Sequence, residues 1–249
     1  HAGQCGLPAP RIVNYSGGPA PLPGEALTGT DSTSRKLDFH VWNDRQLYVV
    51  AAGNEGPAIR TVRSPGVAKN ALTVGMVQDF GYRTIGDIAD RSSRGPTADG
   101  RMKPNVVAPG MWVWSAFPSH PTAYAQDFGT SMATPHVSGL AATLMQHYPS
   151  LQFNPALVRA HLMATAMGHD GVHAKSHVYG LGRTSAYVAH WTHLNNHGWD
   201  TFWSSGHVTS QGFQFRDITV PAGTQRMIVV LTWDEPPASP GLTRAVTYD

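Results

Sequence analysis

The chain has 249 residues, 41% of them hydrophobic and 14% charged, and its formal net charge is +2. An average globular domain has about 25% charged residues, so the weak charge and the absence of a basic run favour neither a nucleic acid nor an acidic partner. The apolar runs are too short to span a membrane, which predicts no membrane partner. Cys5 is the single cysteine, so no disulfide forms within the chain.

Strand and helix patterns alternate over the first part of the chain. Strands are expected over residues 11–15, 47–52, 71–77 and 112–116. The run 47–52 is continuously apolar, as in a strand that is buried on both faces of a parallel sheet. Asp31 and Ser32 can cap a helix over about 33–45, with Leu37 and Val41 on one face.

A helix is expected over residues 131–145, where small and apolar residues recur. Thr130 is a good N-cap residue, which places Ser131 in the first turn. Free amides and the positive end of the helix dipole can stabilise an anion there. Pro135 removes the backbone bond to the Ser131 carbonyl, a cost that indicates a functional site.

The fold class follows from these elements. A second helix is capped by Asn154 and opened by Pro155, with Val158 and Leu162 at helical spacing. Strands that alternate with helices predict an α/β fold, a mostly parallel sheet with helices on both faces. Ligands of such sheets bind beyond the carboxyl ends of the strands, where Ser16 and Asn54 are expected.

The composition changes near Asn196, and we expect a domain boundary at about His197, giving domains 1–197 and 198–249. The second part has a strand-like pattern, with Phe213 and Phe215 alternating, a turn at 221–223 and an apolar strand over 227–233. These few strands are not enough to form the two packed sheets of a complete β-sandwich. The chain begins at His1 without a signal-peptide pattern, which indicates a piece of a longer protein.

The segment from Gly129 to Gly139, Gly-Thr-Ser-Met-Ala-Thr-Pro-His-Val-Ser-Gly, resembles the nucleophile segment of the subtilisin-like serine peptidases, the subtilases. The resemblance implies a serine endopeptidase that hydrolyses peptide bonds through an acyl-enzyme on Ser131. It also implies an incomplete subtilisin-like catalytic domain, followed by the first strands of a β-sandwich. Its partner would be a polypeptide substrate.

The segment 51–56, Ala-Ala-Gly-Asn-Glu-Gly, is similar to the subtilase segment whose asparagine donates to the oxyanion. Carried over, Asn54 and the Ser131 amide form the oxyanion hole. Taken by itself, Asn-Glu-Gly is also a common turn after a strand.

The segment 14–18 resembles the strand on which subtilases bind an extended peptide, although a larger residue often replaces Gly17. The resemblance assigns substrate contacts to Ser16, Gly17, Gly18, Ala52, Gly53, Gly129 and Thr130. Segments 92–101 and 103–110 also look like subtilase segments and are expected to frame the cleft. The family usually has Asp at the position of Asn105, which is expected to weaken a local hydrogen bond.

The catalytic Asp and His of the family precede the segment 14–18, and no matching segment exists here. His1, His40 and His120 match no family position, so we assign no acid or base to this chain. The missing N-terminal part of the catalytic domain is therefore the expected partner of this chain, and residues 1–249 alone are expected to be inactive.

Two alternatives from other classes stay open. A subtilase fold that binds peptides without turnover would have the same segments. A metal-binding protein would use His169, His173 and His177, which recur at intervals of four, although Gly168 and Gly171 disfavour a helix there. We expect no cofactor and no metal; the family resemblance makes calcium possible without an assignable site, and it implies secretion.

Overall fold

The computed structural model describes residues 9–19, 27–78, 86–168, 175–191, 205–206 and 217–246. In chain order its elements are β1 (Ile12–Tyr15), α1 (Ser32–Asp44), β2 (Leu47–Ala51), β3 (Leu72–Val77), β4 (Val106–Pro109), β5 (Val113–Ala116), β6 (Tyr124–Asp127), α2 (Thr130–His147), η1 (Pro149–Leu151), α3 (Pro155–Ala164) and α4 (Ala186–Trp191). Predictions for Cys5, for residues 207–215 and for the boundary near residue 197 lie outside the described residues. Within these residues, no helix is both long and apolar enough for a membrane span.

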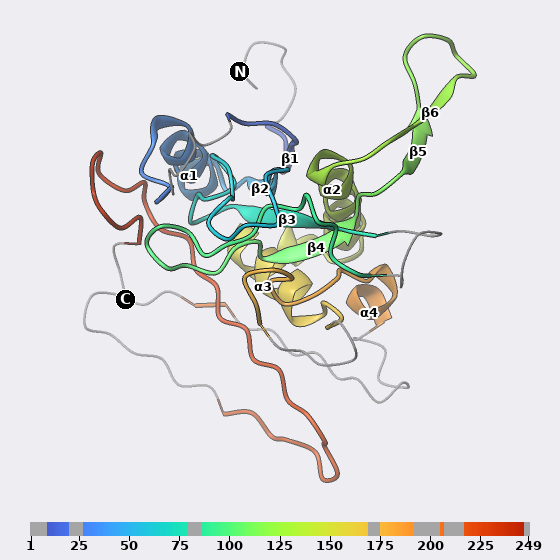
Figure 1. The fold of residues 1–249 in the computed structure, drawn as a ribbon. Coiled ribbons are helices and arrows are strands. Elements are labelled where there is room, and N and C mark those ends of the chain that lie inside the picture. Colours follow the sequence, from blue (N-terminus) through green and yellow to red (C-terminus); the bar gives the residue numbers. More distant parts are fainter. Residues whose placement is uncertain are drawn as a thin grey trace.

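A parallel sheet with the strand order β1-β2-β3-β4 forms the centre of the molecule (Figure 1). Neighbouring strands are also neighbours in sequence, as the pairings Ile12 with Leu47 and Val49 with Leu72 show. The side chains of β3 are buried all along the strand, as the apolar pattern predicts for a sheet covered on both faces.

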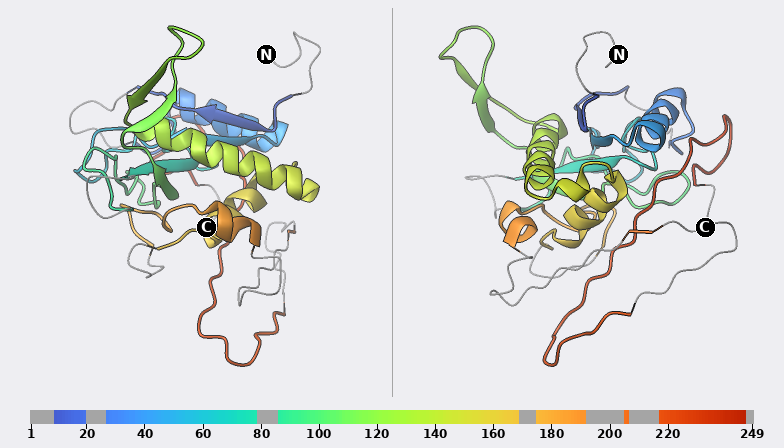
Figure 2. Two further views of the ribbon diagram at one scale, coloured as in Figure 1. Left: turned by 90° about the vertical axis from the view of Figure 1, so that its right-hand side faces the viewer. Right: turned by 180° about the vertical axis from the view of Figure 1, so that it is seen from behind.

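Helices cover both faces of this sheet, which confirms the predicted fold class. On one face α1 places Leu37 and Val41 against Val50 of β2. On the other face α2 and α3 build the larger core, in which Leu144 and Leu162 are almost completely buried. Figure 2 shows α2, in yellow-green, lying along the strands on the face opposite α1.

The predicted caps of two helices are confirmed. Asp31 accepts the amides of Thr33 and Ser34 at 3.1 and 3.0 Å and so caps α1. Asn154 accepts the amide of Leu157 at 3.0 Å and caps α3, with Pro155 in the first turn. Each cap satisfies amides that have no partner within the helix.

The strand expected over 112–116 is present as β5, but it does not join the main sheet. It pairs antiparallel with β6 in a separate two-stranded ribbon, with Trp114 opposite Gln126. In Figure 1 this ribbon projects from the molecule beside α2.

The described part of the tail, 217–246, has no helix and no strand. The turn expected at 221–223 is confirmed, since the Thr224 amide donates to the Pro221 carbonyl at 3.2 Å. The strand expected over 227–233 has no ladder partner here, and Val229 and Leu231 are exposed. The β-sandwich and the domain limits therefore stay predictions.

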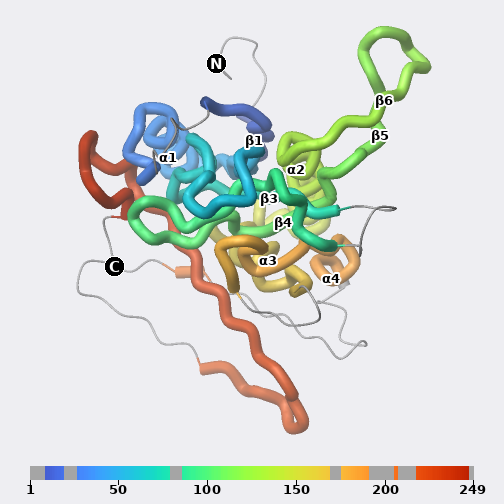
Figure 3. Tube along the Cα trace, in the orientation of Figure 1, coloured from blue at the N-terminus to red at the C-terminus, as the bar shows by residue number. Residues whose placement is uncertain are grey.

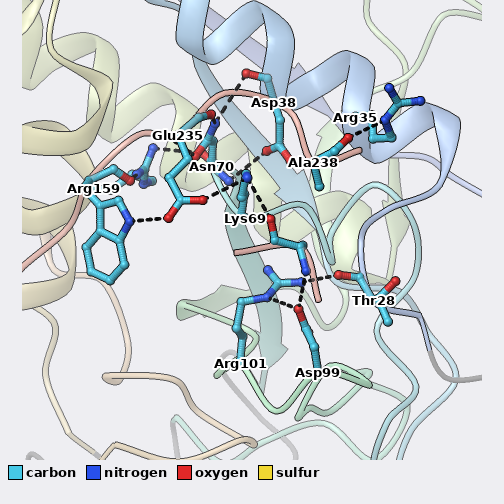
Figure 4. A network of polar contacts seen from close by, with 12 residues as sticks. Thr28, Arg35, Asp38, Lys69, Asn70, Asp99, Arg101, Arg159, Glu235 and Ala238 are labelled. Atoms are coloured by element: carbon cyan, nitrogen blue, oxygen red, sulfur yellow. Dashed lines mark hydrogen bonds and ion pairs between the residues drawn. The ribbon is translucent and has the colours of Figure 1, made fainter. Parts of the chain in front are cut away.

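Residues 232–245, named the strap below, return along the body of the molecule beside α1 and α3 (Figure 3). Two ion pairs fix the strap, Lys69 with Glu235 at 2.9 Å and Arg159 with Asp234 at 2.6 Å, and all four side chains are at most 5% exposed. Figure 4 shows the neighbouring contacts, in which the side chain of Asn70 bonds to both backbone groups of Glu235. The strap thus belongs to the folded body.

Candidate functional site

Ser131 lies in the first turn of α2, as predicted, but the residue that caps the helix differs. Gly129 is the N-cap and, as a glycine, provides no side chain to bond the free amides of the first turn. Thr130 instead begins the helix with its side chain 1% exposed, because its hydroxyl is bonded inward. Among the described residues no group accepts the Ser131 amide, which is therefore left for an anion formed on a ligand.

Asn54 follows β2 and reaches the same helix end. Its Oδ1 accepts the Thr130 amide at 2.9 Å and the Thr130 hydroxyl at 3.1 Å. The Gly53 amide in turn donates to the Thr130 hydroxyl at 3.1 Å. With Oδ1 engaged, the Nδ2 group is the end of the amide that can donate to a ligand, and these bonds hold it in one orientation.

Gly129 provides the space between these donors. Its φ of +149° lies in the range that favours glycine, and a Cβ there would come within 3.3 Å of Asn54 Nδ2. A larger residue would therefore crowd the volume in front of the Asn54 donor and the Ser131 amide.

Ser16, at the carboxyl end of β1, is paired reciprocally with Ser131. The Ser131 hydroxyl donates to the Ser16 carbonyl at 2.9 Å, and the Ser16 hydroxyl donates to the Ser131 carbonyl at 3.1 Å. The Ser131 carbonyl can accept this bond because Pro135, four residues on, has no amide hydrogen. The cost of Pro135 in the helix is thus offset by a contact that fixes the nucleophile candidate against β1.

Gly17 and Gly18 continue from Ser16 along the open side of the site. A Cβ on Gly17 would meet only the Tyr15 ring at 3.9 Å, so a larger residue fits there, as in the family pattern. At Gly18 a Cβ would lie 2.0 Å from the Ser64 carbonyl oxygen, so glycine is required. Arg63 fixes this segment by donating to the Gly18 carbonyl at 3.3 Å.

Ala52 and Gly53 lie beneath the Asn54 loop. The Ala52 amide donates to Val74 and the Gly53 carbonyl accepts from Ser93, at 2.9 and 3.0 Å. Because their backbone groups are bonded within the protein, these two residues support Asn54 from below.

Sequence reasoning missed several supporting side chains. Arg63 forms an ion pair with Glu55, whose carboxylate also accepts the Asn54 amide at 2.9 Å. Asn14 donates to the Ser16 hydroxyl at 2.9 Å and accepts from Ser138 of α2 at 2.9 Å. The glutamate and arginine are eight residues apart, without a pattern that predicts their contact.

Asn105 keeps the acceptor role expected of the family's carboxylate. Its Oδ1 accepts the Thr73 amide at 2.8 Å and the Lys103 ammonium at 3.1 Å. Burial holds the pKa of Lys103 well below its ordinary value, with Arg101 and Arg159 acting in the same direction. A carboxylate at residue 105 would counter this effect and the neutral amide does so only weakly.

No described histidine nitrogen is hydrogen-bonded to Ser131. His40 pairs with Asp44 at 2.7 Å on α1, and His120 bonds Thr122 at 3.0 Å near the tip of the ribbon. His1, His169 and His173 lie outside the described residues. Within the described ranges no group of three or more His, Cys, Asp or Glu side chains is arranged to hold a metal ion, so the alternative with His177 is left without a test.

Comparisons with known proteins match the same region. The sequence profile of the subtilase family matches residues 8–182. Pyrolysin of Pyrococcus furiosus is 39% identical over 185 residues, which are 64% of this chain and 13% of pyrolysin. Subtilisin BL of Lederbergia lenta is 32% identical over 189 residues, covering 76% of this chain and 58% of that protein.

Solved structures agree with this match. The self-cleaved protease domain of PatA superposes with a TM-score of 0.58 at 28% identity, over 80% of this chain and 66% of that one. Sphericase gives a TM-score of 0.57 at 27% identity, over 70% of this chain and 56% of that one. Of the two curated relatives above, the match covers 13% of the length of pyrolysin and 58% of the length of subtilisin BL.

Proposed function

Because the chain belongs to the subtilase family, whose curated members here are serine peptidases, we propose that it carries the nucleophile and oxyanion hole of a serine endopeptidase. The observation that carries this proposal is that Ser131, in the first turn of α2 behind a glycine N-cap, lies next to Asn54, which Thr130 holds in place. No structural role of a helix end requires both features.

The proposed reaction is acyl transfer to Ser131. The Ser131 hydroxyl leaves the Ser16 carbonyl and attacks the scissile carbonyl carbon, while a histidine outside this chain takes its proton. The oxygen that becomes negative is bound by Asn54 Nδ2 and by the Ser131 amide. The scissile carbon–nitrogen bond then breaks, and the histidine gives its proton to the leaving amine. Water hydrolyses the acyl-enzyme, which releases the carboxylic acid and restores the Ser131 hydroxyl.

The substrate is a polypeptide in extended conformation. Its acyl side pairs with the backbone of residues 16–18, where Gly17 leaves the edge open. Ser16 and Gly18 fix this edge relative to Ser131 through the bonds described above. Gly129 leaves space for the scissile carbonyl, and Thr130 holds the Asn54 side chain in place. Ala52 and Gly53 support the loop that contains Asn54.

Labelling with a serine-directed phosphonate tests this function in the full-length protein. We expect mass spectrometry to find the adduct on Ser131, since only an activated hydroxyl reacts. Ser131→Ala should abolish labelling, whereas Ser205→Ala, which removes an exposed serine of the tail, should not. An adduct on another serine with Ser131 unmodified contradicts the assignment.

A peptide-binding module without turnover is the second candidate. It is favoured by the bond of the Ser131 hydroxyl to the Ser16 carbonyl and by the lack of a described histidine bonded to Ser131. Peptide binding without phosphonate labelling would favour it. We further propose that the full-length protein is secreted, which a cleaved signal peptide on that protein would test.

A further inference from the structure

The β5–β6 ribbon exposes an aromatic face that the proposed chemistry does not use. Residues 111–128 contain five aromatic side chains and a single formal charge, on Asp127. Trp114 and Tyr124 are 66% and 68% exposed. Exposed apolar patches of this kind mark binding surfaces more often than chance.

The pairing register places these two side chains together. Trp114 is opposite Gln126 and Ala116 is opposite Tyr124, so all four residues share one face of the ribbon. Trp114 and Tyr124 are diagonal neighbours, within reach of one another for aromatic side chains. Phe117, which follows β5 directly, falls at the position that alternation assigns to the other face.

The ribbon leads directly into the candidate active site. At its base the Trp112 ring packs on the Phe128 ring, with centroids 5.2 Å apart, and Phe128 precedes Gly129. The Gly129 amide donates to the Gly110 carbonyl at 2.8 Å, which ties both arms of the ribbon to the end of α2. In Figures 1 and 2 α2 lies between β1 and the ribbon.

This arrangement orients an extended peptide. Its acyl side lies along residues 16–18 beside β1, so the part that leaves after cleavage runs away from β1, toward the ribbon. We propose that the β5–β6 ribbon binds the leaving-group side of the polypeptide and that Trp114 and Tyr124 bind its apolar side chains. This inference rests on the proposed function, since it takes the scissile bond to lie at Ser131.

The geometry sets a minimum substrate length. Gln126, opposite Trp114, is five residues before Ser131 (131 − 126). A strand advances by about 3.3 Å per residue, so a peptide antiparallel to β6 needs roughly five residues beyond the scissile bond to reach Trp114. The preferred substrates are therefore polypeptides with apolar residues well past the cleavage point.

Binding to the full-length Ser131→Ala protein tests this inference without turnover. Three fluorescent peptides have the same sequence on the acyl side of the scissile bond and differ beyond it. The first has two residues there, the second seven leucine-rich residues and the third seven serine- and glycine-rich residues. Fluorescence anisotropy should show the leucine-rich peptide binding about 10-fold to 100-fold more tightly than the other two, as expected when aromatic side chains become buried.

The paired variant Trp114→Ser/Tyr124→Ser should remove this preference, while Phe117→Ser, an exposed aromatic on the other face, should keep it. Circular dichroism checks that each variant is folded. Equal binding of all three peptides overturns the inference, as does an equal loss in Phe117→Ser. Loss of dimerisation, or of binding to phosphatidylcholine vesicles, with unchanged peptide binding would assign the face to a second copy or to lipid and also overturn it.

The two proposals fail separately. Phosphonate labelling of Ser131 in the unmutated protein reports the chemistry and does not need the ribbon. A protein that selects the leucine-rich peptide but takes no label keeps the ribbon site and loses the peptidase function. A protein that takes the label but binds all three peptides equally keeps the peptidase function and loses the ribbon site.

Discussion

Lys69→Met should destabilise the protein strongly, because the partner of Lys69 is buried in the strap. Glu235 is 2% exposed and Lys69 4% exposed, and the ammonium also donates to the Ala245 carbonyl at 2.7 Å. Removing one member of a buried pair leaves the other charge uncompensated, which costs about 3–5 kcal/mol. For a domain of this size that lowers the melting temperature by roughly 6–20 °C.

A double-mutant cycle separates the ion pair from its surroundings. Glu235→Leu alone should cost a similar amount, since Lys69 would then be the buried unpaired charge. The double variant Lys69→Met/Glu235→Leu leaves no unpaired charge at these two positions and should cost less than either single variant, about 1–3 kcal/mol for the lost bonds to Trp233 and Ala245.

Thermal and denaturant unfolding of the full-length protein measure these values. Asp44→Asn is the control, because its pair with His40 is more than 40% exposed on both sides and contributes about 0.5 kcal/mol at most. A Lys69→Met variant as stable as this control would refute the reasoning, and the strap would then be undocked in solution.

Three further predictions concern the site, the core and the chain as a whole. Asn54→Ala should slow turnover of the full-length enzyme by about 100-fold to 1,000-fold with little change in substrate binding, as steady-state kinetics would show; this magnitude was measured in subtilisin, of the same family, and unchanged turnover would exclude Asn54 from the oxyanion hole. Burial raises the pKa of Asp38 from 3.8 to about 6, so the native state binds the extra proton, and stability should fall by about 3 kcal/mol as the pH rises from 4 to above 6. Denaturant unfolding should show no such contribution in Asp38→Asn, and an identical pH dependence in both proteins would contradict it. Residues 1–249 alone should not cleave a chromogenic peptide at a useful rate, because Ser131 has no assigned base; cleavage that Ser131→Ala abolishes would show that a base is present.

Local chemistry made much of the fold predictable. The apolar run at 47–52 and the caps Asp31 and Asn154 are short-range signals, and each appears in the structure where expected. The positions of Ser131 and Asn54 came from segments similar to the family, and the structure places both at one helix end.

The differences come from long-range contacts. Thr130 has the residue type of an N-cap, but its hydroxyl bonds to the Gly53 amide 77 residues away, and this tertiary contact displaces the cap to Gly129. The apolar run 227–233 predicts a strand, but it has no ladder partner among the described residues, and the strap that follows it is held by side-chain contacts. Its docking depends on Lys69, 166 residues from Glu235, and no sequence pattern links the two.

The strand order of the sheet bears on how the chain acquires its structure. Each strand pairs with the strand made just before it, at separations such as the 35 residues from Ile12 to Leu47, so the sheet can grow stepwise during synthesis. Contacts of the strap close far longer loops, 203 residues from Arg35 to Ala238, and loop-closure entropy rises with length. We therefore expect the strap to dock late on the folding pathway, and until it does, Lys69 and Arg159 lack the carboxylate partners that the strap brings them.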